Sequence, residues 1–178
     1  MGPWPTVNGA VFYQPTPRRP PHCVPRTATF HAVSQQIDRS VLVPFTPAQL
    51  YALVDRVEDY PKFLPWCGGT VVESRDEQRT RASITIDFKG IKQRFSTENL
   101  NDAPHRIDMR LVEGPFRHLD GTWVFQPLGE HACKVQFRLH YEFASRLLEK
   151  LVGPVFDHIA GSFVDAFVAR AEQVYGAP

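Results

Sequence analysis

The sequence is poor in cysteine, and its histidines show no metal-binding spacing. Its 178 residues include three cysteines, Cys23, Cys67 and Cys133, which lie far apart and outside any CxxC pattern. This spacing excludes a disulfide framework and a zinc ribbon, and it favours a reducing compartment. The seven histidines form neither an HExxH motif nor a paired spacing. We therefore expect no metal site.

The sequence also lacks a charge excess and a long apolar run. Its formal net charge of +1 argues against a strongly basic nucleic-acid-binding protein, and we expect no DNA partner, although a local basic patch stays open. No stretch approaches the ~20 consecutive apolar residues of a membrane span. The apolar core of a secretory signal is missing too. We therefore expect a soluble, cytoplasmic protein.

The start of the chain differs in composition from the rest. It has no acidic residue before Asp38, and its many prolines include Pro15, Pro17, Pro20, Pro21 and Pro25. Arginines, serines and threonines give it a faint likeness to an organelle transit peptide, but the prolines prevent the amphipathic helix that such peptides form. The pattern predicts a disordered proline-rich tail over residues 1–34. The remaining length predicts one domain over residues 35–176.

From residue 35 onward the pattern predicts one strand, one helix and six further strands. An extended run over residues 37–43 precedes Thr46, which can cap a helix whose first turn begins at Pro47. We expect this helix to end near Tyr60. The six later strand-like runs cover residues 70–75, 79–88, 91–100, 106–112, 119–126 and 133–143.

The alternation of side chains along these runs predicts an antiparallel sheet with one dry face. For example, Ile84 and Ile86 alternate with Ser83, Thr85 and Asp87. This is the pattern of an antiparallel sheet that is solvated on one side. The dry face therefore needs a cover.

Residues 145–175 can supply that cover, because their apolar positions recur at helical spacing over ~45 Å. Ser145 is a suitable N-cap for such a helix. Gly153 and Pro154 predict a kink or a break into two helices. The expected fold is α+β, with a curved seven-stranded antiparallel sheet wrapped around a long C-terminal helix.

One segment, VEDYPKFLPWCGG at residues 57–69, follows no regular pattern. Pro61 and Pro65 each lack a backbone donor and disfavour the α conformation in the preceding residue, which predicts a turn or a short helical elbow. Elbows usually lie at the surface, so one this apolar must bury its side chains against core or ligand. Those side chains are Tyr60, Phe63, Leu64 and Trp66.

Long blocks of the sequence resemble a known family. They read DRSVLVPFTPAQLYALVDRVEDYP, YPKFLPWC, LVEGPFRHLDGTW with VFQPLGEHACKV, and FASRLLEKLVGPVFDHIAGSFVDAFVARAEQVYG. These blocks are similar to the START-type, helix-grip proteins of the coenzyme Q-binding group, within the polyketide cyclase and lipid transport family. The resemblance covers about residues 35–176 and leaves the tail unexplained.

The resemblance implies a hydrophobic tunnel between the C-terminal helix and the sheet. Such a tunnel would bind ubiquinone or another polyprenyl or acyl lipid. The protein would then support respiration as a carrier or chaperone, with transient contact to a membrane surface at the periphery of the inner membrane. The alternative, implied by bacterial members, is a toxin that binds the large ribosomal subunit and blocks its joining with the small one. Older family labels add oligoketide cyclase or dehydratase, but we expect no catalysis and no catalytic cofactor.

Candidate ligand-contacting residues follow from the elbow and from the resemblance together. The elbow is either a lid over the tunnel mouth or a plug in the core, and a loop over residues 114–116 would close the same end. The polar partner of a quinone headgroup stays open among Tyr60, His118 and Tyr141. The predicted lid and wall residues are Tyr60, Phe63, Leu64, Trp66, Phe95, Met109, Phe116, Trp123, Val155, Ile159 and Phe163.

Enzymatic and ribosomal functions rest on different residues. His118 and Asp120 face the same side of a strand, where a catalytic pair is conceivable and a solvent-side ion pair is the simpler interpretation. Basic side chains of the middle strands would suit phosphate contacts, but acidic residues are interleaved with them, as on any solvated sheet face. The basic residues are Arg75, Arg79, Arg81, Lys89, Lys92, Arg94, Arg106 and Arg110.

Overall fold

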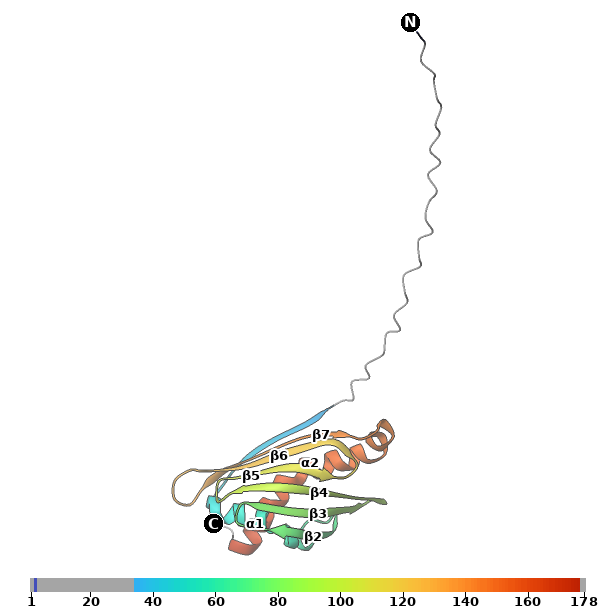
Figure 1. The fold of residues 1–178 in the computed structure, drawn as a ribbon. Helices are drawn as coiled ribbons and strands as arrows, with labels where there is room; N and C mark the ends of the chain where they lie inside the picture. The colour runs from blue at the N-terminus through green and yellow to red at the C-terminus, as the bar shows by residue number, and fades with distance from the viewer. Residues whose placement is uncertain (1, 3–33, 177–178) are drawn as a thin grey trace. The chain divides into compact units, whose positions relative to one another are not determined.

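The computed structural model describes residue 2 and residues 34–176 (Figure 1). The predicted disordered tail therefore lies outside the described residues, except for residues 2 and 34. The described elements are β1 (Gln35–Val43), α1 (Pro47–Asp55), the 3₁₀ helix η1 (Val57–Lys62), β2 (Cys67–Arg75), β3 (Arg79–Phe88), β4 (Ile91–Asp102), β5 (Arg106–Glu113), β6 (Phe116–Pro127), β7 (Cys133–Phe143) and α2 (Arg146–Tyr175).

The strands form one antiparallel sheet in the order β1-β7-β6-β5-β4-β3-β2. From β2 to β7 each strand pairs with the next one in the chain, and β1 pairs with β7, with Val43 opposite Cys133. Register shifts in the β2–β3, β4–β5 and β6–β7 pairings bend the strands, because a bulge increases the local twist. Helix α2 crosses one face of the sheet (Figure 1). The predicted helix-grip fold is confirmed.

The two faces of the sheet differ as the alternation predicts. On β7 every second side chain from Cys133 to Phe143 is buried, and those between are half-buried or exposed. We call the side that α2 covers the inner face, where Phe137 meets Phe163 of α2 with ring centroids 5.5 Å apart. The opposite side, which includes Arg138, is the outer face.

Helix α1 begins as predicted but ends earlier. Thr46 caps it in a capping box with Gln49, and Pro47 occupies the first turn. The helix stops at Asp55 rather than near Tyr60, and η1 follows it. The predicted elbow therefore begins as a 3₁₀ helix with Pro61 inside it, continues as a turn over residues 63–66 and ends in β2, which starts at Cys67.

Helix α2 runs unbroken through Gly153 and Pro154, so the predicted break into two helices does not occur. Pro154 removes one backbone donor, but the buried side chains of Val152 and Phe156 on either side of it pack on the sheet and stabilise the helix. Ser145 caps the helix as predicted, because its hydroxyl accepts a hydrogen bond from the backbone N–H of Leu148 at 3.3 Å.

By length and composition α2 is also apolar enough to cross a membrane, although no membrane span was expected from the sequence. The same test is met by the core helix of a globular protein. Helix α2 has such a role here, because Phe156, Ile159 and Phe167 are buried against the inner face. Packing on the sheet therefore accounts for the apolar residues on the sheet-facing side of α2, whereas Leu147 and Leu151 are exposed.

Candidate functional site

A small cavity lies between α2 and the inner face of the sheet. Its volume is about 60 Å³, and its walls come from η1, the strands β3 to β7 and α2. The predicted residues that line it are Tyr60, Trp66, Phe95, Met109, Ile159 and Phe163. The other lining residues are Val57, Ile84, Ile86, Thr97, Asn99, Leu119, Phe137, Leu139, Phe156 and Ala160. A small cavity with mostly apolar walls therefore lies where the tunnel was predicted.

The cavity is too small for a quinone as it stands. An apolar cavity of about 150 Å³ can hold a benzene molecule, and one water occupies about 30 Å³ of liquid. A volume of about 60 Å³ is well below the first figure. A ring-sized ligand would have to displace side chains or move α2 away from the sheet.

The remaining predicted residues lie outside the cavity lining. Leu64 is buried in the core, with 1% of its surface exposed. Phe63 packs edge-to-face on Phe167, with the ring centroids 5.2 Å apart. Phe116 is the first residue of β6 rather than part of a loop, and it is buried against Phe143 and Phe156. The predicted closing loop therefore has no exposed aromatic tip.

Trp123 and Val155 also stand apart from the cavity. Trp123 is 1% exposed and packs against Phe137 and Phe163 at ring-centroid distances of 4.5 and 5.7 Å. Its indole Nε1 is buried without a hydrogen-bond partner. Val155 is partly buried against the core. A role in ligand binding for these two residues stays a prediction.

The elbow has the burial of a core plug. Trp66 is 6% exposed, and its ring lies 5.5 Å from that of Phe163. Glu58 of η1 also anchors the elbow, because both of its carboxylate oxygens accept hydrogen bonds from Arg75 on β2 at 2.8 and 2.9 Å. This partner lowers the pKa of Glu58 despite its partial burial. The elbow is thus packed on one side and ion-paired on the other.

The predicted headgroup partners are already engaged or face away. Tyr60 donates its hydroxyl hydrogen to the carbonyl of Val54 at 2.7 Å, and burial raises the pKa of Tyr60. Tyr141 donates to the carboxylate of Asp157 on α2, and burial followed by that bond raises the pKa of Tyr141. His118 lies on the outer face, beyond the sheet from the cavity.

Two polar residues that sequence reasoning missed do line the cavity. Thr97 and Asn99 follow Phe95 on β4 at every second position, so all three point to the inner face. The hydroxyl of Thr97 donates to Oδ1 of Asn99 at 3.1 Å. The two amide hydrogens of Asn99 take no part in that bond. The period-2 alternation from Phe95 is the signal that would have placed both residues.

Gly121 on β6 shapes the same cavity. It lies between Met109 on β5 and Leu139 on β7, and both of these side chains line the cavity. A Cβ at Gly121 would approach Cε of Met109 at 2.6 Å and the carbonyl oxygen of Arg138 at 3.1 Å. Glycine at this position therefore leaves space for the methionine side chain.

The outer face of β2, β3 and β4 carries a paired charge cluster. The carboxylate of Glu73 forms ion pairs with Nε of Arg81 at 2.8 Å and with Nη2 of Arg94 at 3.9 Å. It also accepts hydrogen bonds from the hydroxyls of the buried Ser83 and Ser96. Hydrogen bonds from Ser83, followed by those from Arg81, lower the pKa of Glu73. The basic side chains here are held by a carboxylate of the same protein.

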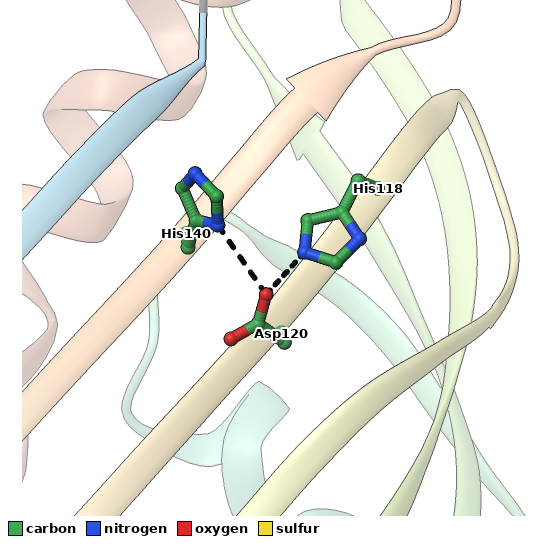
Figure 2. A group of neighbouring side chains, drawn as sticks. All are labelled: His118, Asp120 and His140. Atoms are coloured by element: carbon green, nitrogen blue, oxygen red, sulfur yellow. Dashed lines mark hydrogen bonds and ion pairs between the residues drawn. The ribbon is translucent and has the colours of Figure 1, made fainter.

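A second polar cluster lies on the outer face of β6 and β7 (Figure 2). His118 and Asp120 are joined through Nε2 and Oδ1, and Nδ1 of His140 lies 3.5 Å from the same oxygen. The pair of His118 and Asp120 was anticipated, but His140 was not. The β6–β7 register, which places His140 opposite Asp120, brings the third side chain in.

Residues 43–168 match the family described as polyketide cyclase / dehydrase and lipid transport. The chain belongs to this family. The ribosome association toxin RatA of Vibrio cholerae is 43% identical to it over 142 residues, which cover 80% of this chain and 99% of the relative. The mitochondrial coenzyme Q-binding protein COQ10 homolog B of Xenopus laevis is 30% identical over 172 residues, covering 91% of this chain and 70% of the relative.

Solved structures of other proteins share the fold. The 18 kDa protein CC1736 of Caulobacter crescentus is 33% identical with a TM-score of 0.64, and the match covers 80% of this chain and 99% of that one. The ZhuI aromatase/cyclase of Streptomyces sp. R1128 has a TM-score of 0.72 at 13% identity, with coverage of 82% and 100%. At that identity the likeness shows the fold alone. The relatives named above are a toxin and a coenzyme Q-binding protein, so the fold is shared by proteins of different activity.

Proposed function

We propose that the protein is a ribosome-association factor that binds the large ribosomal subunit in the cytoplasm and opposes its joining with the small subunit. The observation that carries this proposal is the end-to-end similarity, at 43% identity, to a protein named for ribosome association. The cavity favours the same choice, because at about 60 Å³ it would have to widen before a quinone could enter between α2 and the sheet.

Sedimentation of the full chain with purified bacterial ribosomal subunits tests the proposal. We expect the protein to travel with large subunits in a sucrose gradient and to lower the fraction of joined subunits when magnesium is restored. Binding should weaken with added salt, because phosphate contacts release counterions. A protein that stays at the top of the gradient at low salt, with subunit joining unchanged, would overturn the proposal.

The outer face of the middle strands is a candidate for the contact, and a charge reversal can test it. Arg81 and Arg94 pair with Glu73, and Lys92 lies 3.6 Å from Asp87, so this face is partly neutralised. Changing all three basic residues to Glu should reduce cosedimentation if the ribosome competes for them. A matched control carries the same change of charge on other elements, at Lys134, Lys150 and Arg170. Equal binding by wild type and both triple variants would remove this face from consideration.

We also propose, as a second function, that the cavity admits an apolar ligand such as a quinone when α2 moves away from the sheet. The observation in its favour is the polar pair inside apolar walls, because the amide hydrogens of Asn99 can donate to a carbonyl oxygen. A ligand that displaced Phe163 would also approach the unpartnered indole N–H of Trp123. The similarity to a coenzyme Q-binding protein supports this ligand class.

Organic extraction of protein purified from a membrane-containing lysate tests the second function. We expect an isoprenoid quinone to be recovered from wild type and to decrease in Asn99→Leu, which keeps the branched shape of the side chain, is somewhat larger and removes the donor. Leu147→Asn, on the exposed face of α2, is the matched control. A wild-type extract without quinone, or equal recovery from Asn99→Leu, would exclude this use of the cavity. Ribosome binding is measured separately, so either function can fail alone.

A further inference from the structure

The cluster of His118, Asp120 and His140 on the outer face has the composition of a metal site. Asp120 and His140 are opposite each other in the β6–β7 pairing, and His118 precedes Asp120 by two residues on β6. All three side chains therefore project from the same side of the sheet, as Figure 2 shows. Their three ligand atoms lie within 4.8 Å of one another.

From this arrangement we propose that His118 Nε2, His140 Nδ1 and an oxygen of Asp120 bind a divalent transition-metal ion of the Zn²⁺ or Co²⁺ class. Two imidazoles and one carboxylate suit these ions, whereas Mg²⁺ and Ca²⁺ prefer oxygen ligands alone. Zinc bonds of about 2.0–2.2 Å in tetrahedral geometry require ligand atoms roughly 3.3 Å apart. The 3.5 Å between Nδ1 of His140 and Oδ1 of Asp120 already fits this spacing. Small side-chain rotations would bring Nε2 of His118 to the same spacing from the other two ligand atoms.

A neighbouring hydroxyl fixes the orientation of one imidazole. Nε2 of His140 is hydrogen-bonded to Oγ of Ser34, just before β1. When that nitrogen carries the hydrogen, Nδ1 keeps its lone pair and directs it toward Asp120. Metal-ligating histidines commonly donate their second ring nitrogen to an oxygen, because this selects the tautomer and the ring orientation. Ser34 therefore acts as a positioning residue for the proposed site.

The surroundings leave the three ligands available. Arg138 pairs with Asp38 at 3.1 Å and Arg117 pairs with Glu142 at 3.0 Å, so these two guanidinium groups are held by other carboxylates. Asp120, His140 and Thr122 also border an open groove of about 260 Å³. With three protein ligands, at least one coordination position would face this groove and stay open to water or another small ligand.

Calorimetric titration of the full chain with Zn²⁺, repeated with Co²⁺ and visible absorption, tests the site. We expect one ion per chain in wild type, with Co²⁺ giving the absorption of nitrogen and oxygen ligands. Ser34→Ala should weaken binding about tenfold, the low end of the range for a lost supporting partner. His118→Ala, His140→Ala and Asp120→Asn should each weaken it further.

Two controls separate this site from other metal ligands. His131→Ala removes an exposed imidazole outside the cluster and should bind Zn²⁺ as wild type does. Thermal melting of each apo variant should match wild type, because the substituted side chains lie on the surface. A wild-type protein that binds neither ion would overturn the proposal. Binding that survives all three ligand substitutions and is lost in Cys23→Ser would overturn it as well, by assigning the metal to a thiol.

Discussion

The inner and outer faces of the sheet are built from the same strands but differ in what their side chains can do. On the inner face, aromatic rings from β6, β7, η1 and α2 fill the space down to a cavity of about 60 Å³. On the outer face, carboxylates, guanidinium groups and imidazoles form exposed ion pairs. The inner face therefore contributes most of the stability, and the outer face holds most of the groups that can bind ions or charged partners.

This difference changes how the apolar elbow is understood. An apolar segment between prolines has the same sequence pattern whether it closes a ligand tunnel or fills the core. The burial of Trp66 and Leu64 places it with the inner face. Substitutions on the inner face should therefore cost more stability than substitutions on the outer face.

Trp66→Ala should produce the largest loss of stability. Trp66 lines the cavity at 6% exposure and packs on Phe163, so truncation enlarges a void that the surrounding rings cannot fill. We expect a cost of about 3–5 kcal/mol in the free energy of unfolding, measured by urea denaturation. Leu147→Ala, at a side chain that is 68% exposed, should stay within about 0.5 kcal/mol. A cost for Trp66→Ala of about 1 kcal/mol or less would return the elbow to the role of a lid.

Gly121→Ala should cost about 1–3 kcal/mol, because the added methyl group overpacks the inner face against Met109 and the backbone of Arg138. Met109→Ala should relieve part of this cost by removing the nearer contact. A double-mutant cycle should then give a coupling of at least about 0.5 kcal/mol. Strictly additive costs would mean that the backbone contact decides the effect and that Gly121 does not shape the cavity.

Tyr141→Phe should cost about 1 kcal/mol, because it removes the hydrogen bond from β7 to Asp157 of α2 and keeps the ring. Tyr175→Phe removes a longer hydrogen bond, in which the hydroxyl of the exposed Tyr175 donates to the carbonyl of Gln49 at 3.3 Å. This change should cost less than about 0.5 kcal/mol in the free energy of unfolding. Thermal melts of the two variants give the comparison. Equal costs would show that the inner-face bond contributes no more to stability than the exposed bond of Tyr175.

Glu58→Gln should have the smallest effect, at most about 1 kcal/mol at neutral pH, because its partner Arg75 is partly exposed. Arg75 lowers the pKa of Glu58, so the folded state favours the charged carboxylate. The stabilisation is therefore present above the ordinary carboxylate pKa and is lost as the pH falls below it. Wild type and variant should converge in denaturant midpoint at acid pH, while Glu172→Gln should match wild type throughout. If the difference in denaturant midpoint between wild type and Glu58→Gln did not change with pH, the ion pair would not be the cause of the stabilisation.

Features governed by local chemistry were predictable from the sequence. Thr46 with Pro47 and Ser145 set the helix starts because capping depends on neighbouring residues. Side-chain alternation gave the sheet and its buried face. Helix α1 ends earlier than predicted, at Asp55, and the hydroxyl of Tyr60 donates to the carbonyl of Val54 in its last turn, a contact that the local sequence does not specify.

The site was predicted only in part, because cavity walls and clusters depend on register between distant strands. Trp123 was predicted to line the cavity because it is large and apolar. In the structure Phe137 and Phe163 pack against it and line the cavity instead. His140 joins His118 and Asp120 only through the β6–β7 pairing. Sequence spacing does not reveal that pairing.

The pairing of β1 with β7 also determines when the sheet can be completed during translation. Gln35–Val43 leaves the ribosome early, but its partner Cys133–Phe143 is made about 90 residues later. At about 5–20 residues per second, β1 waits roughly 5–20 s before its neighbour exists. The sheet can assemble from β2 onward during that time, and β1 joins it only near the end of translation. A nascent chain stalled before residue 133 would therefore expose an unpaired strand to chaperones and proteases.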